Sequence, residues 1–358
     1  MQRDYPQNKI NIAPLSQLPL LLIADTSVPE ALGKKLVRGS ETLGLKVGID
    51  LHVAYNSPAP QFSPSMQRLR GKLFYRLSDR RSWEWWGFQR HLKELVIAMR
   101  PKLMLVTGIL PLETGIFKEI KEGGGRVVNY LTDDPWNPIH RRRSFLRNLC
   151  HYDHIFSTKQ ALCSRLKKAG TRSTSWLPFA YDPALHHPPV MSSQRAAADV
   201  LFVGTGAAER LPWLEALKDL PGARRRIHGN NWRGLHPTGW DLQRAVTGEA
   251  YCEEIHSAGI VLGLLRQANG DLSTDRSYEI GAIGGCGLYQ DSSEHRALLP
   301  HYPDEGFFST PAQLHERVQH LLKNPDLRQR LRELGDQALR KPEHTYAARL
   351  QTMINWRE

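Results

Sequence analysis

The sequence predicts an α/β protein of two domains, each a doubly wound parallel sheet covered by helices. Short apolar runs that end in polar or glycine-containing loops alternate with amphipathic helical stretches along most of the chain, which is typical of this fold class. The alternation stops at a polar, proline-containing run at residues 186–198 and then starts again. A length of 358 residues also suits two hydrophobic cores better than one.

The composition is that of an ordinary globular protein. Hydrophobic residues make up 41% of the chain and charged residues 23%, which argues against a disordered chain. No apolar run approaches the ~20 residues that cross a bilayer, and residues 1–9 lack the apolar segment of a secretion signal. The four cysteines are scattered without C-x-x-C spacing, so we expect neither a zinc site nor a disulfide framework. The sequence therefore predicts a cytoplasmic protein, with the inner face of the membrane as an alternative location.

Basic residues exceed acidic residues by 48 to 36, which gives a formal charge of +12 and favours anionic partners. Residues 66–100 are basic and aromatic together, and their spacing predicts two amphipathic helices that pack on the sheet with their arginines in water. An alternative is peripheral contact with an anionic membrane, because basic residues beside Trp and Phe suit the headgroup boundary. A nucleic-acid surface ranks last, since no recognised nucleic-acid motif accompanies these residues.

The first domain is expected over residues 1–185. Its strands are predicted at residues 19–24, 47–55, 101–108, 126–131 and 153–158, and its other helices at 29–43, 113–122 and 159–170, with a loop at 56–65. Asp133 and Asp134 follow the fourth strand directly. Because ligands of such sheets bind beyond the carboxyl ends of the strands, these carboxylates are candidate active groups. The alternative is a turn or a helix cap, which is common for Asp-Pro.

The second domain is expected over residues 199–340, after a linker at 186–198. Its strands are predicted at residues 199–204, 224–229 and 260–265, in a segment that ends at residue 290, and around residues 306–308. One helix is predicted to begin after the loop that contains residue 271 and to end at residue 284, and the others are predicted at 212–220, 249–258, 295–299, 311–322 and 324–339. A last helix is expected within residues 341–358.

Residues 260–291 carry the functional interpretation. They are predicted to form a strand, loop, helix and strand, the crossover from which parallel sheets are built. The loop and the start of the helix contain the polar side chains of Arg266, Asp271, Ser273, Thr274, Arg276 and Glu279. A carboxylate near a helix N-terminus can accept adjacent sugar hydroxyls, while free N–H groups and an arginine hold phosphate. This combination suits a nucleotide-sugar.

A glycine loop follows the first strand of the second domain, at Gly204, Thr205 and Gly206. Such a loop entering a helix can hold phosphate on backbone N–H groups. As a dinucleotide fingerprint it is defective, because Glu209 stands at the third glycine position, where a negative side chain would face a pyrophosphate unfavourably. A nicotinamide-dependent oxidoreductase nevertheless remains an alternative.

The D-x7-E spacing of Asp271 and Glu279, followed by a glycine-rich helix end, resembles the group 1 glycosyltransferases of the GT-B fold. The segments RSYEI at 276–280 and GGCG at 284–287 are more similar to the CgeB-like, or spore maturation protein-like, branch. Other similar segments are D-D-P at 133–135, L-P-F-A-x-D-P at 177–183, F-V-G-T at 202–205, H-G-x-x-W at 228–232 and H-T-Y-x-x-R at 344–349.

The resemblance implies two Rossmann-like domains that face a cleft, with the last helix returning to the first domain. It implies that the second domain binds a nucleotide-sugar donor, UDP- or GDP-linked, with no further cofactor. The residues expected to bind the donor are Gly204, Thr205, Gly206, Arg210, Gly229, Arg266, Asp271, Ser273, Thr274, Arg276 and Glu279. Fixed cations near the leaving diphosphate would stabilise the transition state.

We therefore predict a glycosyltransferase that moves a sugar to a hydroxyl of a glycan, lipid or protein acceptor. The predicted catalytic residues are Asp133 or Asp134 at the acceptor hydroxyl and Glu279 at the hydroxyls of the donor. No D-x-D triplet lies beside the binding loops, so we expect no metal ion. The alternatives are an NAD(P)-dependent oxidoreductase and a non-catalytic, membrane-associated scaffold that uses residues 66–100.

Overall fold

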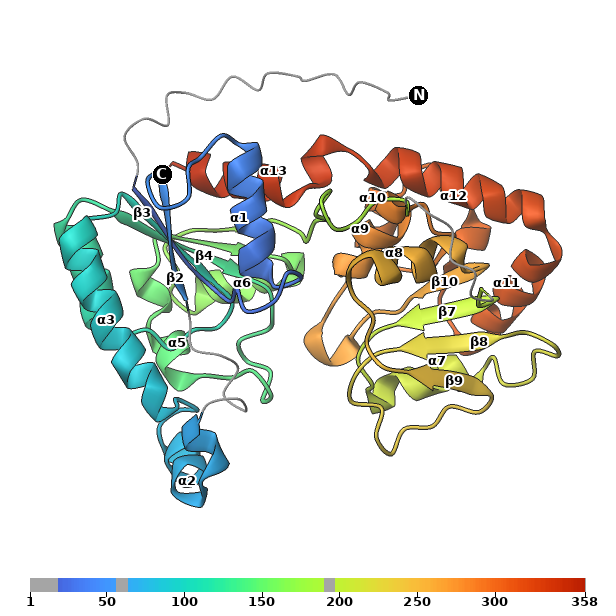
Figure 1. Ribbon diagram of the computed structural model, residues 1–358, viewed down its shortest axis with the longest axis horizontal. Coiled ribbons are helices and arrows are strands. Elements are labelled where there is room, and N and C mark those ends of the chain that lie inside the picture. The colour runs from blue at the N-terminus through green and yellow to red at the C-terminus, as the bar shows by residue number, and fades with distance from the viewer. Residues whose placement is uncertain (1–18, 56–63, 190–196, 358) are drawn as a thin grey trace.

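Two parallel sheets form the framework of the molecule (Figure 1). The computed structural model describes residues 19–55, 64–189 and 197–357. Within these ranges each sheet has six strands, in the orders β2-β1-β3-β4-β5-β6 and β12-β11-β10-β7-β8-β9. The predicted α/β class with two doubly wound sheets is confirmed. Residues 1–18, most of the loop predicted at 56–65, and residues 190–196 of the predicted linker lie outside the described residues.

The first sheet is built from residues 20–176. Its strands are β1 (Leu20–Ala24), β2 (Leu51–Tyr55), β3 (Leu103–Thr107), β4 (Arg126–Leu131), β5 (His154–Ser157) and β6 (Thr174–Trp176). Its helices are α1 (Leu32–Thr42), α2 (Leu69–Leu77), α3 (Trp83–Met99), α4 (Thr114–Glu122), α5 (Arg143–Arg147) and α6 (Gln160–Lys168). Side chains of β1 alternate between two apolar clusters, with Leu21 and Ile23 in one and Leu20 and Leu22 in the other, so helices cover both faces of the sheet.

The second sheet is built from residues 200–308. Its strands are β7 (Val200–Val203), β8 (Arg225–His228), β9 (Trp240–Gln243), β10 (Ile260–Gly263), β11 (Gly287–Gln290) and β12 (Phe307–Phe308). The helices that follow residue 210 are α7 (Leu211–Glu215), α8 (Gly248–Ser257), α9 (Asp275–Ile283), α10 (Ser293–Leu298), α11 (Pro311–Lys323), α12 (Pro325–Leu339) and α13 (Tyr346–Asn355).

Several predicted boundaries differ from the structure. The strand predicted at 47–55 begins at Leu51, because residues 46–50 form a turn in which Asp50 accepts a hydrogen bond from the Lys46 N–H at 2.8 Å. The helix predicted at 212–220 ends at Glu215. Strands β6 and β9 were not predicted. Both are edge strands with few buried residues, so their sequences lack the apolar run of a central strand.

Helix α13 packs on the first domain. Its residues Tyr346, Leu350 and Met353 belong to the same apolar cluster as β1 and α1. The approach of the two helices is close, since a Cβ at Gly39 of α1 would lie 3.0 Å from the Ala347 nitrogen. The chain thus crosses between the sheets twice, and the crossings are hydrogen-bonded: the Tyr181 N–H donates to the His344 carbonyl at 3.0 Å.

The two helices predicted within residues 66–100 are present, but their packing differs from the prediction. Helix α3 packs on the sheet through Trp85, Leu92 and Val96. Helix α2 does not, and it projects from the lower end of the first domain in Figure 1 with its leucines in water. The spacing of apolar residues predicts an apolar stripe on α2, but it does not predict which face of the helix the rest of the protein covers. None of the helices in the described ranges has the length and apolar content that a membrane span requires.

Candidate active site

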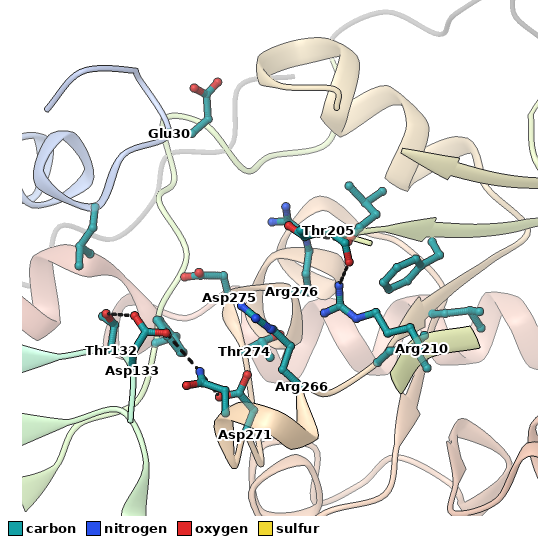
Figure 2. Close-up of a pocket in the computed structure, with 18 of the residues that line it drawn as sticks. Glu30, Thr132, Asp133, Thr205, Arg210, Arg266, Asp271, Thr274, Asp275 and Arg276 are labelled. Atoms are coloured by element: carbon teal, nitrogen blue, oxygen red, sulfur yellow. Dashed lines mark hydrogen bonds between the residues drawn. The ribbon is translucent and has the colours of Figure 1, made fainter. Parts of the chain in front are cut away.

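A cavity of about 370 Å³ lies where the carboxyl ends of strands from both sheets meet. The first domain contributes residues that follow β1 and β4, and the second contributes residues that follow β7 and β10 and the start of α9 (Figure 2). Its lining consists of Glu30, Leu32, Lys35, Thr132, Asp133, Phe179, Phe202, Val203, Gly204, Thr205, Arg210, Leu262, Leu264, Arg266, Asn269, Asp271, Thr274, Asp275, Arg276 and Tyr346. Parallel-sheet proteins bind their ligands in this position, and the volume lies in the range of small-molecule sites.

Three arginines form the cationic wall of the cavity on the second-domain side: Arg210, Arg266 and Arg276 (Figure 2). Burial, and then the neighbouring charge of Arg266, lower the pKa of Arg210 to about 10. The Arg210 Nε is buried and has no hydrogen-bond partner among the described residues. Arg266 likewise forms no ion pair with a described residue. A buried cation beside like charges is unfavourable without a counter-charge, so this wall is suited to an anion.

The loop after β7 shapes one end of the cavity. Thr205 accepts a hydrogen bond through its carbonyl from Arg210, and Gly204 lies directly beside the same guanidinium. Glu209 points elsewhere, because its carboxylate accepts a hydrogen bond from the Ala268 N–H at 2.8 Å. The expectation that Glu209 would face a bound pyrophosphate is therefore wrong.

Two of the glycines predicted to bind the donor are packing positions outside the cavity lining. A Cβ at Gly229 would lie 1.9 Å from the Gly204 carbonyl oxygen, and a Cβ at Gly206 would lie 2.4 Å from the Asn231 carbonyl oxygen. Only glycine allows these two loops to approach so closely. Gly206 and Gly229 thus set the position of the cavity-lining loop.

The N-terminus of α9 opens at the cavity through Thr274. A reciprocal cap holds this end of the helix: the Thr274 N–H donates to Ser277 Oγ at 2.9 Å, and the Thr274 side chain accepts from the Ser277 N–H. Ser277 Oγ in turn donates to His295 Nε2 at 2.7 Å, and His295 Nδ1 donates to the Gln290 carbonyl at 2.7 Å. This chain of bonds requires a neutral His295, and burial lowers its pKa to about 4. Ser273 lies outside the cavity lining, where its hydroxyl donates to Glu294 at 2.5 Å.

Asp271 lines the cavity floor and pairs with the first domain. Its Oδ1 is 2.6 Å from Lys159 Nζ and accepts from Asn269 Nδ2 at 3.0 Å. Burial raises the pKa of the Asp271 carboxyl although Lys159 opposes that shift. The other carboxylate oxygen has no hydrogen-bond partner in the described part of the chain, so it can accept one from a ligand.

Glu279 lies behind the cavity and is only 1% exposed. Its Oε1 contacts Lys35 Nζ at 3.2 Å and His186 Nε2 at 3.3 Å. Its Oε2 accepts from the Tyr251 hydroxyl at 2.9 Å and from Arg276. Burial alone would raise the pKa of Glu279, but Arg276, His186 and Lys35 hold it well below its usual range. In this structure the carboxylate predicted to bind donor hydroxyls is therefore occupied by four protein groups.

The two first-domain carboxylates have different positions. Asp133 lines the cavity, where its carboxylate accepts from Thr132 Oγ1 at 3.1 Å and from Asn269 Nδ2 at 3.3 Å (Figure 2). Asp134 turns away and accepts from the Trp136 N–H at 2.8 Å, as a residue in an Asp-Pro turn does. Of the two candidate acceptor-side carboxylates, Asp133 is therefore the one that a ligand in the cavity can reach.

Several residues at the site are not indicated by the sequence, among them Lys35, Lys159, His186 and Asn269. Lys35 and Lys159 belong to the first domain, and each forms a buried ion pair with a carboxylate of the second, Glu279 and Asp271 respectively. No local motif signals such pairs. Arg266 and Arg276 stand beside Asp271 and Glu279 in the sequence, so neither acid indicated that its partner would come from the first domain.

Comparisons with known proteins concern the family and the fold. A family model described as glycosyl transferase-like matches residues 210–355. No curated protein matches the chain.

Solved structures of the same fold cover nearly the whole chain. HepE from Anabaena, solved in complex with UDP, has a TM-score of 0.61 at 10% identity, over 94% of this chain and 98% of its own. The β-glucosyltransferase of phage T4 has a TM-score of 0.56 at 13% identity, over 94% and 99%. A UDP-N-acetylglucosamine 2-epimerase, assigned as putative, from Listeria monocytogenes has a TM-score of 0.56 at 11% identity, over 95% and 97%. Identities this low show a shared fold. They show that the chain has the two-sheet GT-B fold, and residues 210–355 in addition resemble the glycosyl transferase-like family.

Proposed function

We propose that the protein transfers a sugar from a UDP-linked donor to a hydroxyl of a glycan, lipid or protein acceptor, with the donor held in the cavity between the sheets. Residues 199–340 bind the donor and residues 1–185 present the acceptor, while 341–358 complete the first domain. UDP is the favoured nucleotide because related structures were solved with UDP or UDP-glucose. Residues 276–287 favour a place in the CgeB-like branch.

The observation that carries the proposal is the arginine wall. Arg210 is buried, lacks a described carboxylate partner and lies near Arg266 and Arg276 at one end of the cavity. A diphosphate would supply the missing counter-charge, and its own charge grows as the bond to the sugar breaks. Three fixed guanidinium groups can stabilise that charge without a divalent ion.

The opposite wall supplies acceptor chemistry. The acceptor oxygen attacks the anomeric carbon while the bond from that carbon to the diphosphate oxygen breaks. Asp133 accepts the hydroxyl proton if the reaction inverts the anomeric centre, whereas the departing phosphate accepts it in a retaining reaction. Asp271 accepts hydroxyls of the donor sugar through its unpaired carboxylate oxygen. Glu279 lies behind the lining and orients Arg276 through their ion pair.

Donor binding is tested first, by thermal shift with UDP, UDP-glucose, UDP-N-acetylglucosamine, GDP-mannose and NADH. A ligand that binds only the native state raises its stability by about 2.7 kcal/mol at a hundred times Kd. We expect a shift with UDP and UDP-sugars in the wild type and in Arg330→Met, a control on the exposed face of α12. The shift should be lost in Arg266→Met. A shift with NADH alone would instead identify an oxidoreductase.

Transfer is tested next, with Asp133→Asn as the diagnostic variant and Asp134→Asn as its matched control. Loss of a general base lowers turnover by about 10²–10⁴-fold. We expect Asp133→Asn to keep donor affinity and to lose UDP release in the presence of acceptor, with Asp134→Asn close to the wild type. Equal activity in the Asp133 variant would remove Asp133 from the reaction, while the donor result would stand on its own.

A further inference from the structure

Helix α2 presents a stripe of leucines to solvent. Leu69, Leu73 and Leu77 are 84%, 59% and 79% exposed. Their spacing of four residues places them within about 80° of the helix circumference. Single exposed apolar side chains are common on protein surfaces, but three aligned on one projecting helix form a patch that a partner can cover.

The fold itself turns this stripe outward. Gly71 is buried, and a Cβ there would lie 1.9 Å from the Ser65 carbonyl oxygen in the preceding short helix (Pro64–Gln67). Ser65 is in turn fixed to Glu84 of α3, since its N–H and hydroxyl donate to the carboxylate at 2.8 Å and 2.7 Å. Gly71 lies about 160° around the helix from Leu73. The close contact between Gly71 and Ser65 on one face of α2 therefore keeps the leucines on the opposite face, in solvent.

The end of α2 is fixed as well. Asp79 accepts hydrogen bonds from the backbone of Arg143 and Ser144 at 2.8 Å each, and from the Ser144 hydroxyl at 2.5 Å. These bonds lower the pKa of Asp79 against the effect of burial. Asp79 is the one acidic residue within residues 66–82, and it is engaged at the start of α5. The face of α2 that meets solvent therefore carries leucines and basic residues but no acidic side chain.

Cations flank the leucines on both sides. Arg76 and Lys72 lie on one side of the stripe and Arg70 on the other, as helical spacing requires, and all three are exposed. No ion pair joins any of them to an acid in the ranges that the structure describes. Lys72 and Arg76 also line a hollow with Met66, Tyr75 and Arg80. The first turn of α3 adds two exposed tryptophans, Trp83 and Trp86, whose side chains are 46% and 43% exposed.

We propose that α2 docks the protein on an anionic lipid bilayer. The leucine stripe enters the boundary between headgroups and acyl chains, while Arg70, Lys72 and Arg76 pair with headgroup phosphates. An apolar stripe flanked by cations and followed by tryptophans has the chemistry of an interfacial helix. Nucleic acid fits less well, because its interfaces are polar and would leave the leucines without a partner. This surface is separate from the cavity, so the inference does not depend on the proposed transfer reaction.

The experiment is flotation of the full-length protein with phosphatidylcholine vesicles that contain or lack phosphatidylglycerol. One variant, Lys72→Glu/Arg76→Glu, reverses charge, and another, Leu69→Ser/Leu73→Ser, removes apolar contact. The matched controls are Lys323→Glu/Arg330→Glu, the same charge change on α11 and α12, and Ile49→Ser, an apolar residue that is 67% exposed elsewhere. Circular dichroism verifies that every variant is folded.

We expect the wild type and both controls to float with the anionic vesicles, and binding to weaken at high salt. Each basic residue near an anionic surface raises the affinity about fivefold, so reversal of two should weaken binding by at least about 25-fold. The leucine variant should lose binding to a similar extent. The proposal is overturned if the wild type does not float, or if either variant floats like the wild type. Duplex DNA binding that is lost on charge reversal and kept in the leucine variant would overturn it in favour of a nucleic-acid surface.

Discussion

Replacement of Lys35 with methionine tests the contact that joins the two domains behind the cavity. Lys35 on α1 and Glu279 on α9 lie 3.2 Å apart, with side chains that are 8% and 1% exposed. Breaking a buried pair from one side typically costs about 3–5 kcal/mol, because the remaining charge loses its partner in a poorly solvated place. For Lys35→Met we expect the lower end, about 3 kcal/mol, since Glu279 keeps Arg276 as a cationic neighbour.

The opposite change should cost more. Glu279→Gln leaves Lys35 and Arg276 close together with no carboxylate between them, so we expect about 5 kcal/mol. The double variant should be less unstable than the sum of the two single variants, with a coupling energy of about 1–3 kcal/mol. Because Glu279 is so buried, its removal should also unfold part of the population. Loss of transfer in a Glu279 variant is therefore not by itself a sign of a catalytic role.

The assay is urea unfolding of the wild type, both single variants and the double variant, followed by fluorescence. Lys118→Met is the control, because Lys118 and Glu122 are 3.6 Å apart with side chains that are 74% and 59% exposed, and such surface pairs contribute less than about 0.5 kcal/mol. A Lys35→Met protein as stable as this control, or a coupling energy near zero, would refute the reasoning.

The pH dependence gives a second measurement of the same pair. The pKa of Glu279 is depressed in the folded protein, so its contribution to stability is complete above the ordinary pKa of 4.5 and is lost as pH falls below that value. The cost of Lys35→Met should therefore be constant between pH 8 and about 5. It should shrink only in stronger acid.

Three further predictions concern the walls of the cavity. In the wild type, burial lowers the pKa of His295 from 6.5 to about 4, so this group lowers the free energy of unfolding by up to about 1.4 kcal/mol for each pH unit as pH falls through that window. His295→Gln should therefore lose less stability on acidification than the wild type. Urea midpoints at several pH values will measure the difference. Arg210→Met should weaken UDP binding by roughly 10–100-fold, which is the contribution of one hydrogen bond to a charged group. The melting temperature of the ligand-free variant should equal or exceed that of the wild type, because Arg210 is buried beside like charges. Gly229→Ala should lower the melting temperature, because the new Cβ would lie 1.9 Å from the Gly204 carbonyl oxygen. Gly222→Ala is the control for backbone strain alone, since Gly222 has a positive φ of 72° and a Cβ there would have no contact within 4 Å.

Local patterns in the sequence were sufficient to predict the two sheets and the cavity wall that comes from residues 260–291. Strand β10, the loop and α9 are consecutive, so Arg266, Asp271 and Arg276 can be assigned to one edge of a sheet without knowledge of the rest of the chain. Interactions between the domains could not be predicted in this way. Lys35 and Glu279 are 244 residues apart, and only the docking of one domain on the other brings them together.

The same limit applies to the packing of Gly206 and Gly229 and to helix α2. Gly229 follows a strand and precedes Trp232, a pattern that fits a ligand loop as well as a tight crossing of two loops. Its role depends on the Gly204 carbonyl, which belongs to another strand. In α2, the sequence gives the direction of the leucine stripe relative to Gly71, but the side that is buried is decided by Ser65 and by the anchoring of Ser65 to α3.

Helix α9 connects the proposed donor site with the contact between the domains. Arg276 lines the cavity, and Glu279, one turn later on a neighbouring face, pairs with Lys35 of the first domain. The Arg276 guanidinium also bonds to Glu279, so an anion that binds in the cavity competes with Glu279 for the same cation. If a diphosphate draws Arg276 toward the cavity, the negative charge of Glu279 becomes more available to Lys35, and the domains are held together more strongly. Because such coupling is reciprocal, a protein that has lost the Lys35 contact must also bind its donor less tightly.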